Sequence, residues 1–310
     1  MKLRTQFAAL SVIALLTSAS AQAEAARVSL RDWTWPPAII CALILTAALY
    51  STGLAKMFRH GADRKLHIRP MVYFALGWAS LVIALDSPIH ELGEQLFWVH
   101  MTQHEILMLV SAPLLVLSRP LVPFLWALPD SIRMKVVGVG RNRIVSSSWR
   151  LVSAPFAAWL LSALALWMWH APALFDGTLH SEWIHAAQHS TFFLTALLFW
   201  WPLANRQSVL GYGGALVYVF TTALHTSILG ALLTFAPRAW YASYLTSAPE
   251  WGISALEDQQ IGGLIMWIPA GTLLLIVSLV LLVKWLKASD TRWEYTRMAA
   301  LAHHSKGAGE

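Results

Sequence analysis

Two histidine pairs lie at the starts of long apolar stretches, and each pair has the spacing of neighbours on one helix face. The pairs are His100-Met101-Thr102-Gln103-His104 and His185-Ala186-Ala187-Gln188-His189. Side chains four residues apart on a helix lie about 6 Å apart at Cβ, so both rings of a pair can reach one ligand. Ionisable groups within a membrane are costly and are usually functional. The two pairs therefore predict a shared metal or haem site.

The composition is that of a membrane protein that crosses the bilayer several times. The chain has 310 residues, of which 57% are hydrophobic and 12% are charged. Such values fall outside those of ordinary soluble domains. We predict an all-α membrane protein, a seven-transmembrane helix bundle that follows an N-terminal signal peptide. The expected spans lie near 37–57, 71–87, 96–117, 152–170, 183–203, 213–235 and 260–284, because about 20 apolar residues cross a bilayer.

The ends of the chain have a different character from the predicted helix domain at 37–287. Residues 1–23 resemble a secretory signal, with Lys2 and Arg4 before an apolar run and Ala21-Gln22-Ala23 at a cleavage site. Residues 24–36 are then an outer segment, and residues 288–310 are a polar cytoplasmic tail that we expect to be loosely ordered.

Charge predicts the orientation in the membrane. Most lysines and arginines fall in loops on the predicted inner side, whereas only Arg27, Arg31 and Arg238 fall outside after the signal. This positive-inside pattern places the N-terminus outside and the C-terminus in the cytoplasm of a bacterial inner membrane. The long inner loop 119–151 begins apolar and becomes basic, which is typical of an amphipathic segment on the inner leaflet.

Topology brings the histidines together near the outer face. Both pairs lie at the outer ends of their spans, within one helical turn of the same depth. His170 ends the fourth span at this level, and His225 lies midway along the sixth. The predicted metal ligands are His100, His104, His170, His185, His189, Met101 and Met266. His90 and His180 are expected in solvated outer loops.

Copper is the metal that these residue types favour. Imidazole suits copper, zinc and iron, whereas thioether sulfur favours Cu(I). Cys41 is the only cysteine, which excludes an internal disulfide and a multi-thiolate site.

Three further polar residues could support the metal. Glu105 follows His104 inside a span and could pair with a histidine of another helix or relay protons. Asp258 precedes the last span and could cap that helix or orient a metal-bound imidazole. His225 is a third supporting candidate. Gly262 and Gly263, which follow Asp258, permit close helix contact.

Other chemistries lack support in the sequence. There is no Walker loop, G-x-S-x-G, G-x-G-x-x-G or paired-cysteine zinc motif, and nothing favours nucleic-acid binding. We therefore predict no catalytic residues and a protein that is not an enzyme.

An ordered set of motifs between about residues 96 and 270 resembles one family. The stretches are His100–His104, Ala112-Pro113-Leu114-Leu115-Val116-Leu117 with Pro120, Trp169-His170-Ala171-Pro172, His185 with His189, Leu198-Phe199-Trp200-Trp201-Pro202, and Asp258-Gln259-Gln260 with Gly263, Met266 and Trp267. The set is similar to the CtaG family of cytochrome c oxidase assembly factors, the multi-span kind typified in Gram-positive bacteria. The resemblance implies a seven-helix membrane protein needed to assemble haem–copper oxidase, in copper supply. Two departures are Ser111-Ala112-Pro113, where a Pro-Pro pair is expected, and Ser118-Arg119, where a glycine is expected.

Four functions remain open at this point. The first is a copper-handling assembly factor that passes copper to an oxidase subunit or a periplasmic copper chaperone. The second is a bis-His b-type cytochrome, because histidines at equal depth can hold haem b. The third is a non-haem di-iron enzyme, which the predicted orientation argues against. The fourth is a copper transporter that uses His225 and the methionines as a path.

Overall fold

The computed structural model describes residues 33–205 and 210–307, with side chains described up to residue 290. Within these ranges the regular structure is helical, and no β-strand occurs. The predicted signal peptide and most of the predicted outer segment lie outside the described residues. The helices are α2 (Pro37–Arg59), α3 (Arg64–Asp86), α4 (Ile89–Gln95), α5 (Phe97–Glu105), η1 (Ile106–Ser111), α6 (Ala112–Ser118), α7 (Leu121–Ala127), α8 (Asp130–Arg141), α9 (Arg143–Val152), α10 (Pro155–Trp169), α11 (Pro172–His180), α12 (Glu182–Ala204), α13 (Gly211–Thr234), α14 (Tyr244–Ser247), η2 (Ala248–Trp251) and α15 (Ala255–Gly307).

Several of these helices are long and apolar enough to cross a membrane, as a multi-pass protein requires. Among the described residues they are α2, α3, α5 with η1 and α6, α13, and the first 36 residues of α15. A sixth span is possible if α9 and α10, which meet at 62°, are counted together. The predicted fifth span corresponds to α12, whose first two turns hold polar residues. Five or six of the seven predicted spans are therefore supported.

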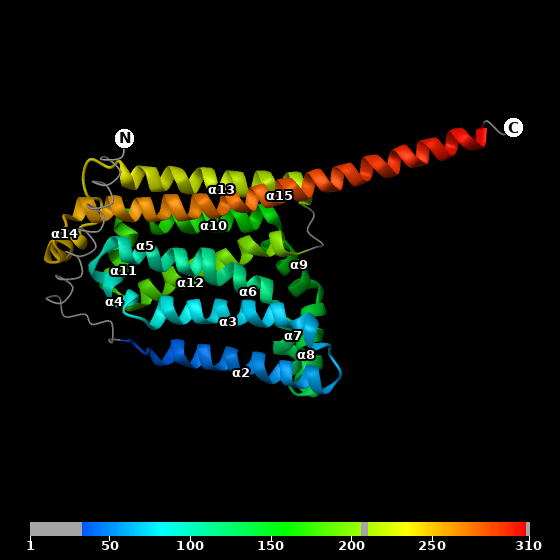
Figure 1. The fold of residues 1–310 in the computed structure, drawn as a ribbon. Helices are drawn as coiled ribbons and strands as arrows, with labels where there is room; N and C mark the ends of the chain where they lie inside the picture. The colour runs from blue at the N-terminus through cyan, green and yellow to red at the C-terminus, as the bar shows by residue number, and fades with distance from the viewer. Residues whose placement is uncertain (1–32, 206–209, 308–310) are drawn as a thin grey trace, which may run out of the picture.

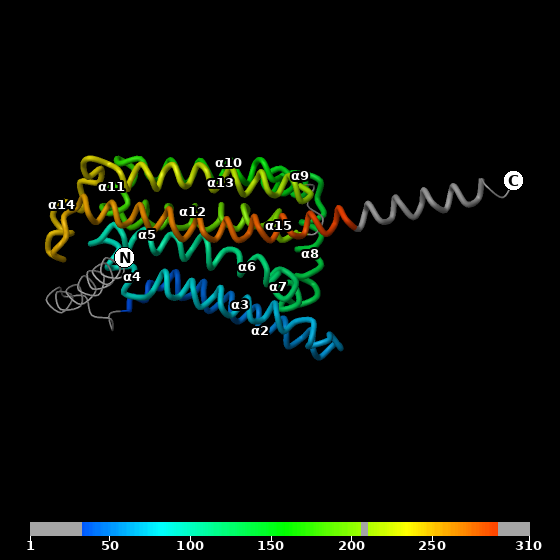
Figure 2. Tube along the Cα trace, turned by 45° about the horizontal axis from the view of Figure 1, so that its top comes forward, coloured from blue at the N-terminus to red at the C-terminus, as the bar shows by residue number. Residues whose placement is uncertain are grey.

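The long helices run side by side with the interrupted span of α5, η1 and α6, and most of the other short helices lie at the two ends of the bundle (Figure 1). Helix α13 packs along α15, α15 packs on α5, and α6 packs on both α3 and α12. Helices α4, α11 and α14 lie at one end, and α8 lies at the other (Figures 1 and 2). The predicted inner loop 119–151 consists of α7, α8 and α9. Helix α15 continues as a helix to Gly307, although a loosely ordered tail was expected from residue 288.

The third predicted span is interrupted where the sequence suggested one continuous helix. After Glu105 the backbone forms the π-helical segment η1, and α6 then carries Pro113 in its first turn. Proline has no amide hydrogen to donate, and its ring clashes with the carbonyl one turn earlier in a regular α-helix. A wider turn before Pro113 relieves this conflict, and π-helical turns often occur at functional sites.

Arg119, which stands where the family resemblance leads us to expect a glycine, has an unusual backbone conformation. Arg119 ends α6 with φ of +50°, and it is the only non-glycine residue with positive φ in the part of the chain that is described. Glycine adopts this left-handed conformation without a steric penalty. The glycine expected from the family resemblance therefore matches the backbone, and arginine occupies the position with some strain.

Two adjacent glycines allow α15 to approach two helices at once. A Cβ on Gly262 would collide with the ring of Phe97 on α5. A Cβ on Gly263 would lie 2.8 Å from the carbonyl oxygen of Gly230 on α13. Small residues at such crossings let membrane helices pack backbone to backbone. The predicted close contact is confirmed, and it brings α5 into its place beside α15.

Candidate metal centre

Five of the predicted histidines lie together at one end of the bundle. His100 and His104 are on α5, His170 is the C-cap residue of α10, and His185 and His189 are on α12. All five are buried, with exposed fractions of 8% or less. The ring centroids within the pairs are 4.4 Å apart for His100 and His104 and 4.3 Å apart for His185 and His189.

The two pairs face each other across the gap between α5 and α12. The His100 and His185 rings are stacked with centroids 5.2 Å apart, and the His104 and His189 rings are also 5.2 Å apart. His170 lies at the edge of the group, with its ring 6.4 Å from that of His104. Spacing along each helix and equal depth therefore bring the rings into one cluster.

His90 is a sixth member of the histidine cluster, and its predicted place in a solvated loop was wrong. Its ring stacks on that of His185 at 5.1 Å and lies 6.1 Å from that of His189. Pro88 is the N-cap residue of α4, which folds back against α5, and a Cβ on Gly93 would lie 3.2 Å from the Cα of His100. His90 and Gly93 are three residues apart, so they share the face of α4 that meets α5. The spacing of His90 and Gly93, H-x-x-G, is the sequence feature that could have placed His90 at this helix contact.

The cluster offers two groups of three nitrogen ligands. His90, His185 and His189 each provide a ring nitrogen, and these atoms lie within 4.8 Å of one another; His100, His104 and His189 do the same. Three histidines are a common donor set for zinc, and imidazole equally suits copper. The geometry is therefore that of a metal-binding site built from imidazole alone.

Many ring nitrogens of the cluster have no hydrogen-bond partner in the protein. The unpaired buried atoms are His100 Nδ1, His104 Nδ1 and Nε2, His170 Nε2, His185 Nε2 and His189 Nε2. A buried polar atom without a partner costs about 1–3 kcal/mol. Most native buried polar groups are paired, so a concentration of unpaired ones requires an explanation. A cation that accepts these lone pairs satisfies several of them at once.

Neighbouring groups fix the orientation of some rings. The carbonyl oxygen of Leu166 accepts from His170 Nδ1 at 2.7 Å, which leaves Nε2 with its lone pair. Gln188 Oε1 lies 3.2 Å from His100 Nε2. Such outer partners fix the tautomer of a ligating imidazole. Gln188 is a residue that the sequence reasoning left without a role, although it stands inside the second histidine motif.

Acidic residues surround the solvent-facing side of the cluster. Glu94 Oε1 lies 3.9 Å from His185 Nδ1, and the Glu94 side chain is 49% exposed. Burial raises the pKa of Glu94, and the charges of Glu182 and Glu91 raise it further. Burial lowers the pKa of His90, although Glu182 and Glu91 act in the opposite direction. The lowered pKa favours neutral imidazole, the form that binds metal.

Asp258 supports the cluster through the backbone of α5. Its Oδ2 accepts from the Phe97 amide at 2.8 Å, and its Oδ1 accepts from the Trp98 amide at 2.9 Å. Its own helix is capped instead by Ser254, whose Oγ accepts from the Glu257 amide at 3.2 Å, while the Ser254 amide donates to Glu257 Oε2 at 2.8 Å. The expectation that Asp258 caps α15 is therefore corrected: it caps α5. Both of its oxygens bind backbone amides, so it positions the helix that carries His100.

Aromatic side chains enclose the cluster. The Phe175 ring is 5.0 Å from that of His100, and the Phe192 ring is 4.6 Å from that of His104. The Tyr244 hydroxyl donates to the carbonyl of Gly93 at 2.8 Å and ties α14 to α4. This apolar surrounding keeps water away from the rings and strengthens any interaction with a cation.

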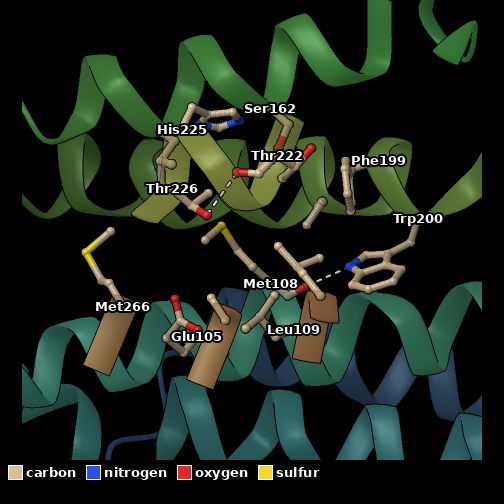
Figure 3. Close-up of a pocket in the computed structure, with 14 residues that line it drawn as sticks. Glu105, Met108, Leu109, Ser162, Phe199, Trp200, Thr222, His225, Thr226 and Met266 are labelled. Atoms are coloured by element: carbon tan, nitrogen blue, oxygen red, sulfur yellow. Dashed lines mark hydrogen bonds between the residues drawn. The ribbon is translucent and has the colours of Figure 1, made fainter. Parts of the chain in front are cut away.

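The remaining predicted site residues lie apart from the rings. Met101 packs in an apolar core with Met266, next to Gly262 of α15. Glu105, Met266 and His225 line a separate cavity of about 50 Å³ (Figure 3). Its volume suits roughly three water molecules. The ring of His225 lies 5.7 Å from that of Trp159 and not within the histidine cluster. The expected thioether ligands and the expected support from His225 therefore do not form part of the cluster.

Comparison with known proteins gives one family. The sequence model described as cytochrome c oxidase caa3 assembly factor, Caa3_CtaG, matches residues 48–288. The chain is also 26% identical over 266 residues to uncharacterised protein Mb0105 of Mycobacterium bovis and to uncharacterised protein MT0111 of Mycobacterium tuberculosis. The match covers 82% of this chain and 39% of each relative, so the chain spans about two fifths of their length. No solved structure matches.

Proposed function

The chain belongs to the family of cytochrome c oxidase caa3 assembly factors, and from this premise we propose that it binds copper in the histidine cluster and supplies it to the haem–copper oxidase. The observation that carries the proposal is the concentration of unpaired ring nitrogens on five buried histidines. Copper is the cargo, and imidazoles are the donors. The choice of copper rests on the family, because the oxidase that the family assembles is a copper enzyme.

The histidine cluster can hold and release a metal without thiolates. His104 has two unpaired ring nitrogens, and its neighbours His100 and His189 have one each. A site made of neutral imidazoles binds copper less tightly than a site with charged thiolates would, which suits a protein that must pass its cargo on. The receiving partner is an oxidase subunit or a periplasmic copper chaperone.

The proposed orientation places the cluster at the outer face of the bacterial inner membrane. Its support is charge: α8 and α9, at the other end from the cluster, carry Arg133, Lys135, Arg141, Arg143 and Arg150. Basic residues collect on the cytoplasmic side of membrane proteins. With α12 as the remaining span, the chain crosses seven times, with the N-terminus outside and the C-terminus inside.

The decisive experiment measures copper in detergent-purified protein loaded with Cu(I) under reducing conditions. Wild type should retain about one ion per chain, as one shared three-nitrogen site requires. The His100→Ala/His189→Ala variant should lose it. His225→Ala is the matched control, because it removes a half-buried histidine of the bundle outside the cluster, and it should retain copper. Equal copper in wild type and the double variant would overturn the assignment.

Copper supply needs a second readout in cells. A deletion strain grown under copper limitation should contain oxidase with less copper, and wild-type protein should restore it while the double variant should not. Normal copper content of the oxidase in the deletion strain would refute supply.

Transport across the membrane is the second candidate. The cavity lined by Glu105, Met266 and His225 follows directly after His104 along the third span and offers polar groups within the bundle. Copper uptake into vesicles that contain the protein would support transport. Uptake no faster than in empty vesicles would exclude transport and leave the passing of copper to a partner protein as the function. A haem b is less well supported, because a porphyrin would have to fit between rings that lie 4.3–6.4 Å apart.

A further inference from the structure

His189 belongs to both groups of three histidines, and this makes the cluster a site with two positions. We call His90, His185 and His189 the mouth triad, and His100, His104 and His189 the deep triad. We infer that a copper ion binds first at the mouth triad and then moves to the deep triad, with His189 as the ligand common to both. The inference rests on the proposed function and adds a direction of loading to it.

The two triads differ in their access to solvent. The mouth triad includes His90, which is only partly buried, and lies beside Glu94, which is half-exposed. His100 is fully buried in the deep triad, and His104 is 2% exposed. The rings of Phe175 and Phe192 pack against His100 and His104, respectively, and separate them from solvent. An ion that arrives from solvent therefore meets the mouth triad first.

His189 can serve only one ion at a time. Its Nε2 is buried and unpaired, and one nitrogen lone pair forms one bond to a metal. The two triads lie within one cluster, so two cations there would also repel each other strongly in a low-dielectric interior. The positions are therefore alternatives, and His189 keeps hold of the ion during the exchange of the other ligands.

The mouth triad should bind more weakly than the deep triad. The amide nitrogen of Gln103 donates to the carbonyl of Ala84 at 2.6 Å and lies 3.2 Å from His90 Nδ1. The Nδ1 lone pair of His90 faces this amide, so a metal bound at Nδ1 would displace Gln103. A metal bound at Nε2 of His90 would require the ring proton to move from Nε2 to Nδ1, where it would face the Gln103 amide. Either arrangement disturbs the contact with Gln103. In the deep triad His104 has both nitrogens free of such a contact.

Charge favours entry at the mouth. Glu91 and Glu182 act electrostatically on His90, and Glu94 lies beside His185. A group of carboxylates at the entrance to a low-dielectric site raises the local concentration of cations and their rate of association. The imidazole ligands favour a borderline metal cation such as copper or zinc, and we use Cu(I) as the probe.

The test measures loading rate and equilibrium affinity separately, on the full chain in lipid nanodiscs. Cu(I) is delivered from a chromophoric chelator, whose absorbance gives both quantities. His90→Gln should slow loading by about tenfold or more and leave the equilibrium affinity within about twofold, since the deep triad is intact. His180→Gln is the matched control at the same end of the bundle, where His180 is exposed, and it should change neither.

Two further variants complete the test. His100→Gln/His104→Gln should retain copper at the mouth with lower affinity, and adding His90→Gln should abolish that binding. Glu94→Gln removes a half-exposed charge and no ligand while keeping the size of the side chain, and it should slow loading at low salt only.

Three results would overturn the inference. The first is that His90→Gln weakens equilibrium binding as much as His100→Gln/His104→Gln does. The second is an unchanged loading rate in both His90→Gln and Glu94→Gln. The third is a His100→Gln/His104→Gln variant that folds and holds no copper. Absence of copper from wild type would instead overturn the proposed function itself, so the two failures are distinguishable.

Discussion

Asp258→Asn should destabilise the protein strongly, although the two side chains have the same size and shape. Asp258 is fully buried, and its two oxygens accept from the amides of Phe97 and Trp98, the first residues of α5. Asparagine has one acceptor oxygen, and its amide group would face the other backbone N–H. One hydrogen bond to a charged group, worth about 1.5–3 kcal/mol, is lost, and one buried N–H is left unpaired at about 1–3 kcal/mol. We expect a combined loss of about 2.5–6 kcal/mol.

The assay is unfolding by increasing fractions of sodium dodecyl sulfate in mixed micelles, followed by tryptophan fluorescence. Glu257→Gln is the matched control. Glu257 is the adjacent acid, and it bonds to Ser254 of its own helix at the exposed surface. Its loss should have a smaller effect because water can replace the bond.

The same variant should also affect the histidine cluster. Asp258 holds the start of α5, and His100 and His104 follow on that helix, so a frayed start displaces both rings. Copper affinity should therefore fall in Asp258→Asn and stay unchanged in Glu257→Gln. Unfolding midpoints that are equal in Asp258→Asn and Glu257→Gln would refute the assignment of Asp258 as the cap of α5.

Two further predictions concern the backbone. Gly263→Ala should destabilise by about 1–3 kcal/mol, because the added methyl group would lie against the backbone of Gly230; Gly271→Ala, which meets nothing within 4 Å, is the control and should be neutral or stabilising in the same unfolding assay. A loss of stability in both variants would show that helix contact is not the cause. Arg119→Gly should stabilise by about 1 kcal/mol, because it relieves a left-handed residue, whereas Arg119→Ala should give no gain. A gain in Arg119→Ala would point to the removed charge instead of the backbone.

The helices were the most predictable part of the fold, for a simple physical reason. A span requires a long apolar run, and such a run is visible in a sequence without knowledge of its neighbours. Details that depend on local backbone conflicts were not visible. The apolar run 96–117 hides a π-helical segment before Pro113, and the run 152–170 begins with a 62° bend between α9 and α10. The second span is expected from about residue 71, whereas α3 begins at Arg64, where the side chain of Asp63 accepts from the Lys65 amide.

The histidine cluster was predictable where one helix determined the geometry. Spacing predicted that His100 and His104 share a face, and depth predicted that they meet His185 and His189. The place of His90 depends on how a seven-residue helix folds back onto α5, which is a tertiary contact. Met101 stands beside His100 in sequence, but it lies about 100° around the helix and faces α15 instead of the rings. Nearness in sequence was therefore a poor guide to the ligands, and helix phase was a good one.

The histidines of α5 lie on a short helix that is fixed at its start and interrupted at its end. Helix α5 is only nine residues long, and its first amides are bound by Asp258 from α15. Its last residue, Glu105, is followed by the wide turns of η1, which change the helix phase before α6. His100 and His104 thus belong to a segment whose start is fixed by another helix and whose end is separated from the rest of the span. The wide turns of η1 are therefore where we expect the third span to take up any small change in backbone when an ion exchanges the ligands of the mouth triad for those of the deep triad.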